Sequence, residues 1–541
     1  MLDNHPFYNW IPRPIGVLIL LFMFVPPTFS GGAYLCNIGE MSGSLGTWTE
    51  DIQLASYFTS IGMCLFPPFM VRFLQTRRIK QTYLLGFLLL IPLNYFCAIT
   101  TSVPLLLVAC LLIGFVRIII MLNCTFTIAP YLTGMDTLSM FTMKEEPSTD
   151  VQYVLERKRT FLMPVLYFYI LLISQASNIL TAWFAYNYKW KDAYFVVIGM
   201  LFVAILIVLC TMPDEKKKQT YKIEWNKVPE MLLMAAALCC MAYVLVYGKT
   251  LDWLYSERIL FATALFLFSC GAFLFFSLYH GAKAYLPLRV FKYRNIWMSM
   301  LLFLLAMLFN SANVFVSMFA KLSTPINNLQ SASLSKWSVL GCFLGLLLSL
   351  LLVKRKVRFR IIFCIAFLLM TASNVFLYFQ FQTVGLFSNM IIPTLLNYTG
   401  LLMLYSVVAA FGMKRLPSHL LATFVFLMIL MRNAIAPVIG SSVYSNRMNR
   451  NQQYYISRLV QNVDEENPLV STNFQKSKRV GLLSGKGTRE AEQFAVTSIK
   501  GRIVVQSIIL AMKNLTGQTI ILLLITVCIT FLLPYKKKET T

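Results

Sequence analysis

Arg117 lies near the middle of an otherwise apolar segment, residues 104–128, that is long enough to cross a lipid bilayer. A charged side chain at the centre of a bilayer costs roughly 2.5–3.5 kcal/mol on insertion scales. Such a side chain normally faces water or a partner inside a helical bundle, so we expect Arg117 to line a pathway through the membrane. The alternative is a structural role, in which the guanidinium bonds to helix carbonyls or extends towards water.

Two further ionisable residues, Arg432 and Glu40, are candidates for transport or coupling. Arg432 lies inside the apolar segment 419–442, where it either takes part in transport or is structural. Glu40 lies just after the first apolar segment, and none of the 22 Asp and Glu residues lies deeper inside a segment. Proton-coupled carriers commonly use a buried carboxylate with a raised pKa, so Glu40 is either a coupling group or a solvated loop residue.

Neutral polar side chains inside the apolar segments either line a cavity or hydrogen-bond between helices. Asn310 and Asn313 share one helix face, and Asn178 lies one turn after Gln175. The full set is Asn123, Gln175, Asn178, Asn310, Asn313, Asn374, Asn397 and Asn433. The nearby aromatic residues Tyr167, Tyr169, Tyr398 and Tyr405 either form a wall for hydrophobic substrates or serve packing alone.

The elements that position these residues are membrane spans. The chain is 58% hydrophobic and 13% charged, with a mean hydropathy of +0.68, which excludes an ordinary soluble domain. Fourteen apolar segments each fit a hydrocarbon core about 30 Å thick. These segments are 14–35, 53–71, 82–99, 104–128, 161–184, 193–212, 230–248, 258–279, 296–319, 336–353, 361–380, 389–412, 419–442 and 517–534.

Short loops rich in Lys and Arg alternate with short loops that contain few. By the positive-inside rule, both termini are predicted to be cytoplasmic, in a multi-pass protein of the cell inner (plasma) membrane. The net charge of +25 is then mainly a topology signal and not a nucleic-acid site. A cytoplasmic loop is predicted at 130–160 and an outer loop at 443–516. Within the outer loop, 488–513 is predicted to form an amphipathic helix that lies on the membrane, on a partner or against its own bundle.

The sequence lacks the residue patterns that metal binding, ATP hydrolysis and transferase activity require. The 12 Cys and 3 His residues show no ligand spacing, which predicts no metal site and no bound cofactor. No Gly-rich phosphate loop is present, so an ATP-driven pump is unsupported. A membrane-embedded transferase that uses Glu40, Glu50 and Asp51 is a remote alternative, because no large catalytic domain follows this short loop. We therefore do not expect an enzyme.

Four stretches carry a family resemblance through their order and spacing. They are the linker and turn with Gly248, Asp252, Trp253 and Ser256, the segment LPLRVFKYRNI at 286–296, the thirteenth apolar segment with Arg432, Asn433 and Gly440, and NYKWKDAYFV at 187–196. Together they resemble the 14-helix drug:proton antiporter branch of the major facilitator superfamily. The motifs are degenerate, since Pro68 and Arg72 replace the family's Gly and Asp, and 175–186 lacks the Gly and Pro of the antiporter motif.

The resemblance implies an all-α membrane protein with the major facilitator superfamily fold. Two six-helix halves, 1–212 and 296–541, would flank a linker and two extra helices at 213–295. It also implies that Arg72, Arg77 and Arg78 clamp the cytoplasmic side, by pairing with acids or helix C-termini.

The implied function is secondary active, proton-coupled export of amphipathic small molecules or drugs by alternating access. The partners are then a small-molecule substrate, protons and the lipid bilayer, and in a Gram-negative host a periplasmic adaptor and an outer-membrane channel. Intramembrane cations without carboxylates favour an alternative, the transport of an anionic metabolite or a lipid-linked anion through a cationic cavity.

Overall fold

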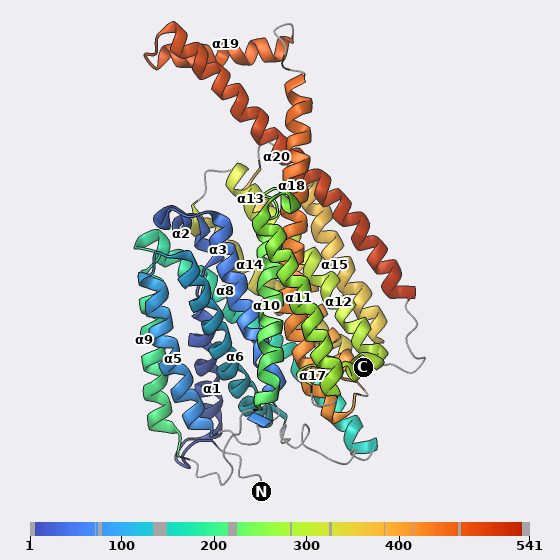
Figure 1. The fold of residues 1–541 in the computed structure, drawn as a ribbon. Coiled ribbons are helices and arrows are strands. Elements are labelled where there is room, and N and C mark those ends of the chain that lie inside the picture. Colours follow the sequence, from blue (N-terminus) through green and yellow to red (C-terminus); the bar gives the residue numbers. More distant parts are fainter. Residues whose placement is uncertain are drawn as a thin grey trace.

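The structure is a computed structural model. The residues that it describes are 6–70, 72–73, 78–133, 149–214, 224–281, 284–323, 327–382, 385–414, 416–461, 463 and 467–532. Arg77 and residues 134–148 of the predicted loop at 130–160 therefore lie outside the described residues. The described chain forms one helical bundle, from which a helical hairpin projects at one end (Figure 1).

The first half contains six long helices, with the short helix α2 (Ile38–Leu45) between the first two. They are α1 (Arg13–Phe29), α3 (Thr49–Leu65), α5 (Ile79–Ile99), α6 (Val103–Thr133), α8 (Thr149–Asn187) and α9 (Asp192–Thr211). Helix α3 begins with polar residues, and Asp51 in its first turn accepts a hydrogen bond from the Trp48 N–H at 3.0 Å. An acidic side chain is favourable at a helix N-terminus.

Two extra helices follow, α10 (Val228–Tyr247) and α11 (Glu257–His280). The second half then consists of α12 (Arg294–Asn310) with its continuation α13 (Val314–Ser323), α14 (Asn328–Lys354), α15 (Phe359–Gln380), α16 (Ile391–Met413), α17 (Ser418–Ile429) with its continuation α18 (Ala436–Gln461), and α20 (Thr488–Leu532). Twelve described helices are long and apolar enough to cross a membrane, and α1 is a shorter apolar helix. Each of the fourteen predicted spans coincides with one of these helical segments, and the predicted all-α fold class is confirmed.

The two halves repeat one packing order. In the first half the second long helix, α3, packs on the fourth, α6, and the third, α5, packs on the sixth, α9. In the second half α14 packs on α16 and α15 packs on α20, which are the same pairs by position. An internal repeat of this kind is typical of secondary transporters. The residue boundaries predicted for the three parts of the chain remain a prediction.

Glycines bring the helix pairs within each half into backbone contact. A Cβ atom at Gly114 of α6 would overlap the carbonyl oxygen of Thr59 in α3, and one at Gly62 would overlap that of Leu111. In the second half, a Cβ at Gly341 of α14 would lie 2.5 Å from the Leu395 carbonyl oxygen of α16. Small residues allow this close approach in a membrane, where no hydrophobic effect drives helices together.

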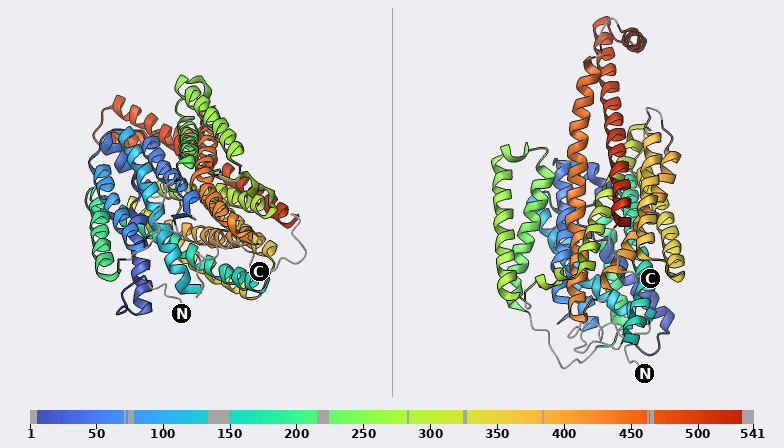
Figure 2. Two further views of the ribbon diagram at one scale, coloured as in Figure 1. Left: turned by 60° about the horizontal axis from the view of Figure 1, so that its bottom comes forward. Right: turned by 90° about the vertical axis from the view of Figure 1, so that its right-hand side faces the viewer.

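The extra helices lie along the seam between the halves. Helix α10 packs against α3 of the first half and α18 of the second, while α11 packs on α10. Figure 2 shows the pair at one edge of the bundle. Many large apolar side chains of α11, such as Phe261, Phe268 and Phe275, are exposed, as expected for a helix that faces lipid.

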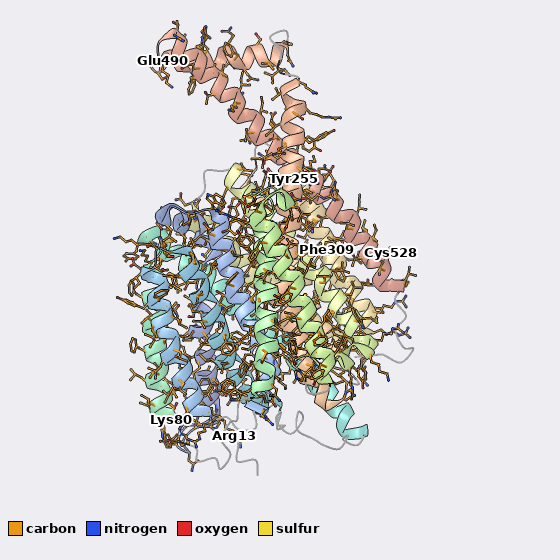
Figure 3. The ribbon with its side chains drawn as sticks, viewed as in Figure 1. Arg13, Lys80, Tyr255, Phe309, Glu490 and Cys528 are labelled. Atoms are coloured by element: carbon orange, nitrogen blue, oxygen red, sulfur yellow. The ribbon has the colours of Figure 1, made fainter. Side chains whose placement is uncertain are left out.

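The predicted outer loop at 443–516 is helical over most of its described length, which corrects that expectation. Helix α18 continues past the bundle to Gln461, α19 (Pro468–Leu483) follows, and α20 returns into the bundle. Near the tip, Gly481 of α19 lies close to Ala491 of α20, and the Lys478 ammonium is 2.7 Å from the Glu492 carboxylate. Arg13 and Lys80 lie at the opposite end of the molecule from Glu490 at the hairpin tip (Figure 3).

The predicted amphipathic helix at 488–513 forms the first part of α20. Its far part packs on α19, so it extends away from the bundle instead of lying along it. Only its last turns reach the bundle, where Ile509 and Met512 are buried in a cluster with Phe315 and Tyr444.

The glycine contact between α3 and α6 yields a stability prediction. Gly114→Val is expected to lower the free energy of unfolding by about 1–3 kcal/mol, because the new side chain overlaps the Thr59 carbonyl and pushes the helices apart. Thermal unfolding in detergent measures the change. The matched control is Gly199→Val on α9, where a Cβ atom meets nothing within 4 Å. Equal stability of the two variants would contradict the close packing.

Candidate functional site

Arg117 lies on the side of α6 that faces the second half. Val108 on the same helix is exposed, and nine residues later Arg117 points to the opposite side. The side chain is partly exposed, but its Nε is buried and has no hydrogen-bond partner among the described residues. Its electrostatic neighbours are Tyr34, which follows α1, and Arg432 of the second half. Arg117 therefore lies on the side of α6 opposite to the exposed Val108, and its role in transport stays a prediction.

Arg432 lies in a π-helical turn, η9 (Leu430–Ile435), that joins α17 to α18. Pro437, just beyond the turn, has no N–H to donate to the carbonyl of Asn433, which favours an irregular turn here. The Arg432 Nε donates to the Asn433 Oδ1 at 2.9 Å, so Asn433 orients the guanidinium. The guanidinium carbon lies 5.4 Å from the ring centroid of Tyr167 on α8, which makes a cation–π contact across the seam.

Aromatic rings continue from Tyr167 into the second half. The ring centroids of Tyr167 and Tyr405 of α16 are 5.8 Å apart, and Tyr405 stacks on Phe303 of α12 at 5.7 Å. This forms the predicted apolar wall, here called the aromatic wall (Tyr167, Tyr405 and Phe303). Tyr169, also expected there, instead donates a hydrogen bond to the Leu21 carbonyl of α1.

A polar cluster lies beside the aromatic wall. The Gln175 Nε2 is 3.5 Å from the Tyr398 hydroxyl, which also interacts with Asn313. The Asn397 Nδ2 donates to the Asn310 Oδ1 at 3.0 Å. The structure thus brings together four of the predicted cavity residues, from α8, α12 with its continuation, and α16.

The remaining predicted polar residues are placed differently. Asn123 is buried within α6, and Asn374 is buried and donates to the Met370 carbonyl of its own helix at 2.9 Å. Asn178 is exposed on α8, yet it lies about 140° around the helix from the exposed Val165 and Trp183. Its exposure therefore indicates open space on the inward side of α8.

Glu40 lies away from the two arginines. Its Oε1 accepts a hydrogen bond from the Asn328 Nδ2 at the start of α14, and its Oε2 is buried without a partner among the described residues. Glu40 on α2 and Asn328 belong to different halves. Nearby, the Tyr57 hydroxyl of α3 donates to the Ser441 Oγ of α18 at 2.6 Å. These contacts join the two halves towards the end of the bundle from which the hairpin projects.

Of the predicted cytoplasmic gate residues, Arg72 contacts the linker. An Arg72 Nη1 is 2.9 Å from the Glu224 carboxylate, which also contacts the Lys227 ammonium at 2.8 Å. Glu224 precedes α10, so Arg72 ties the first half to the extra helices. Arg78 lies 3.4 Å from the Gln81 side chain, and Arg77 is outside the described residues.

One buried acid was not predicted as a site residue. Glu230 in the first turn of α10 is only 1% exposed. Its sequence signal is a carboxylate directly after Pro229 at the start of an apolar segment, which also suits an ordinary helix N-terminus. The sequence does not distinguish a buried Glu230 from an exposed acid at a helix N-terminus, because burial depends on how the neighbouring helices pack.

The central arrangement can bind but shows no catalytic constellation among the described residues. Among the described residues, the groups that contact or electrostatically influence Arg117 and Arg432 include Tyr34, Tyr167, Tyr405, Cys64 and Asn433, and none of these is an Asp or Glu. Two cations beside an apolar aromatic wall suit a ligand that carries both a negative charge and apolar surface.

The sequence matches no family model, and no curated protein matches it significantly. Solved structures do match. A peptide transporter POT in complex with sulfate is 14% identical, with 96% of this chain and 99% of that chain covered at a TM-score of 0.53. Tetrameric PepTSo2 is 12% identical, with 96% and 98% covered at a TM-score of 0.53.

The nucleoside transporter NupG is 11% identical, with 96% of this chain and 99% of that chain covered at a TM-score of 0.51. These likenesses show that the chain has the major facilitator superfamily fold, with two six-helix halves and two extra helices. The finer resemblance to the 14-helix drug:proton antiporter branch remains a prediction.

The environment of Arg117 yields a prediction that separates a functional from a structural arginine. Arg117→Met is expected to raise the free energy of unfolding by about 1–3 kcal/mol, because it removes a poorly compensated charge from the bundle and keeps the side-chain length. The midpoint of thermal unfolding in detergent measures this. Arg258→Met at the exposed start of α11 is the matched control. A large loss of stability would show that Arg117 is structural.

Proposed function

We propose that the chain is a secondary active transporter that works by alternating access and binds a small amphipathic anion between Arg117 and Arg432. The observation that carries the proposal is that Arg117 and Arg432, from opposite halves, influence each other electrostatically, with no carboxylate among their described partners. Its fold supports transport, since structures with this fold include peptide and nucleoside transporters.

Electrostatics explain why an anion suits this site. The two guanidinium groups repel each other in an apolar surrounding, where charges interact more strongly than in water. A carboxylate or phosphate relieves this repulsion and accepts paired hydrogen bonds from the planar guanidinium. Because the arginines belong to different halves, one bound anion would draw the halves together, which favours an occluded state.

The aromatic wall supplies the apolar part of the proposed site. The partly exposed ring of Tyr167 presents an apolar face next to Arg432, and the buried rings of Tyr405 and Phe303 pack behind it. An apolar ligand body that covers the Tyr167 ring gains binding free energy through surface burial. The polar cluster around Tyr398 and Asn310 adds neutral hydrogen-bonding groups that fix the ligand's orientation.

Proton-coupled export of amphipathic drugs is the second candidate. The aromatic wall and the resemblance of the linker motifs favour it, and Glu40 offers a carboxylate at the outer end of the seam. The positive-inside rule predicts that both termini are cytoplasmic, and the hairpin would then lie on the outer side. There the exposed Leu469, Leu483 and Val496 offer an apolar surface to a periplasmic adaptor.

Flux into proteoliposomes under an imposed pH gradient tests the substrate class. Carboxyfluorescein is the anionic probe and ethidium the cationic probe. We expect the anion to move and the cation not, and we expect Arg117→Met and Arg432→Met each to lower anion flux by at least about tenfold, as for loss of a charged hydrogen bond. Arg258→Met serves as the control. Gradient-driven movement of ethidium alone would replace this proposal with drug export.

Glu40 separates the two candidates in the same assay. If the anion proposal holds, Glu40→Gln should keep more than about half of the flux, because a glutamine still accepts the hydrogen bond from Asn328 at little cost. If Glu40 instead carries the coupling proton, the variant should lose gradient-driven flux and retain exchange of substrate across the membrane. Glu257→Gln on exposed α11 is the matched control.

A further inference from the structure

The segment between α11 and α12 runs through the inner end of the seam. Its residues Ala284, Tyr285, Leu286 and Val290 are all less than 9% exposed. A connection between membrane helices normally lies on the surface, so this degree of burial needs an explanation. The described neighbours of Tyr285 provide one.

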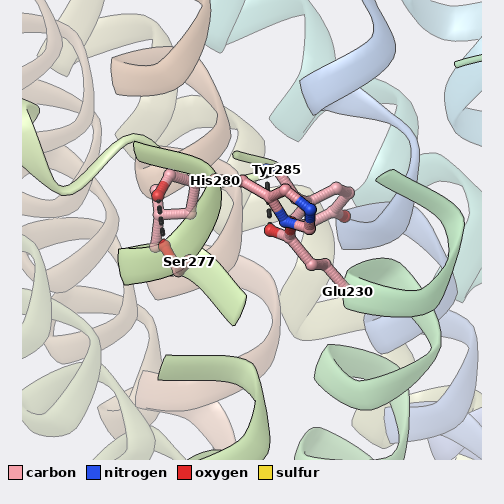
Figure 4. A network of polar contacts seen from close by, with 5 residues as sticks. Glu230, Ser277, His280 and Tyr285 are labelled. Atoms are coloured by element: carbon pink, nitrogen blue, oxygen red, sulfur yellow. Dashed lines mark hydrogen bonds and ion pairs between the residues drawn. The ribbon is translucent and has the colours of Figure 1, made fainter. Parts of the chain in front are cut away.

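Glu230 holds the backbone of this segment in place. Its Oε2 accepts a hydrogen bond from the Tyr285 N–H at 2.8 Å, and its Oε1 is 2.7 Å from the His280 Nδ1 (Figure 4). The Ser277 Oγ of α11 donates to the Leu286 carbonyl at 2.7 Å. Burying a carboxylate is costly unless both oxygens are satisfied, and here both are. The carboxylate thus ties both extra helices to one short stretch of backbone.

The Tyr285 side chain joins the two halves. Its hydroxyl donates to the Leu65 carbonyl at the end of α3 at 2.7 Å, and its ring lies 5.9 Å from that of Phe69 just beyond. On the other side, the ring lies 5.6 Å from that of Phe426 in α17 of the second half. Cys64, next to Leu65, is buried and faces the Ile429 carbonyl of the second half at 3.7 Å.

We propose that residues 284–286 form an inner latch. Tyr285 is the side chain that closes the inner end of the seam between α3 and α17, and Glu230 is the positioning residue that holds it there. The latch rests on the alternating-access mechanism proposed above. The inner side opens when Tyr285 leaves the space between Leu65 and Phe426, and the extra helices control that step because Glu230 and Ser277 belong to them.

The latch is tested by the accessibility of Cys64, measured as its rate of labelling by a membrane-impermeant maleimide on the inner side and located by peptide mass spectrometry. Tyr285→Ala removes the side chain that closes the seam, and it should raise the labelling rate of Cys64 about tenfold or more. Glu230→Gln weakens the hold on the Tyr285 backbone, and it should raise that rate about threefold or more. Glu257→Gln, an exposed acid on α11, should label at the wild-type rate.

Unchanged labelling of Cys64 in both Tyr285→Ala and Glu230→Gln would overturn the latch. Cys110, buried in the first half, reports on folding and should stay unlabelled. If Tyr285→Ala exposes Cys110 as well, Tyr285→Phe and Glu230→Gln decide, because both keep the shape of the residue. Tyr285→Phe removes the hydroxyl that contacts Leu65, and Glu230→Gln removes the charge and one of the two acceptor oxygens. The readout needs no substrate, so fast labelling in a protein that moves no anion would reject the proposed transport site and not the latch.

Discussion

A guanidinium group in the middle of an apolar bundle must have water, a ligand or another polar group beside it, and Arg117 imposes this constraint on the whole molecule. The bundle meets it by turning Arg117 away from the lipid-exposed side of α6 and towards the seam between the halves. The described surroundings leave its Nε without a hydrogen-bond partner. The partly exposed Arg432 and Asn433 lie on the second half's side of this region.

Helix packing within each half differs from packing between the two halves. Within each half, glycines bring α3 onto α6 and α14 onto α16 at backbone contact, so neither pair can slide without a large steric cost. Between the halves, α8 packs along α14 and α16, and the seam also contains hydrogen bonds and ring contacts such as that of Tyr57 with Ser441. The hydrogen bonds are individually weak and reversible, which suits halves that move about a site between them.

The extra helices and the hairpin add to this frame in different ways. Helix α10 lies along the seam, and its Glu230 binds the segment that leads to the second half. Glu224, just before α10, binds Arg72 of the first half. The hairpin of α18, α19 and α20 extends outward at the opposite end of the bundle from Arg13 and Lys80.

The sequence by itself determined the helices, because an apolar stretch of bilayer length can satisfy its backbone only as a helix, and the polar interruption at Arg117 marks the interior whichever helices surround it. It also identified Arg432, Asn310 and Asn397 as candidate site residues, because polar atoms within apolar spans need partners. Only the tertiary structure decided which partners these are. The contact of Arg432 with Tyr167, that of Glu40 with Asn328 and the burial of Glu230 join residues far apart in the chain. They depend on how each helix is rotated against its neighbours, and with both helix faces apolar, hydrophobic periodicity carries too little information to specify that rotation.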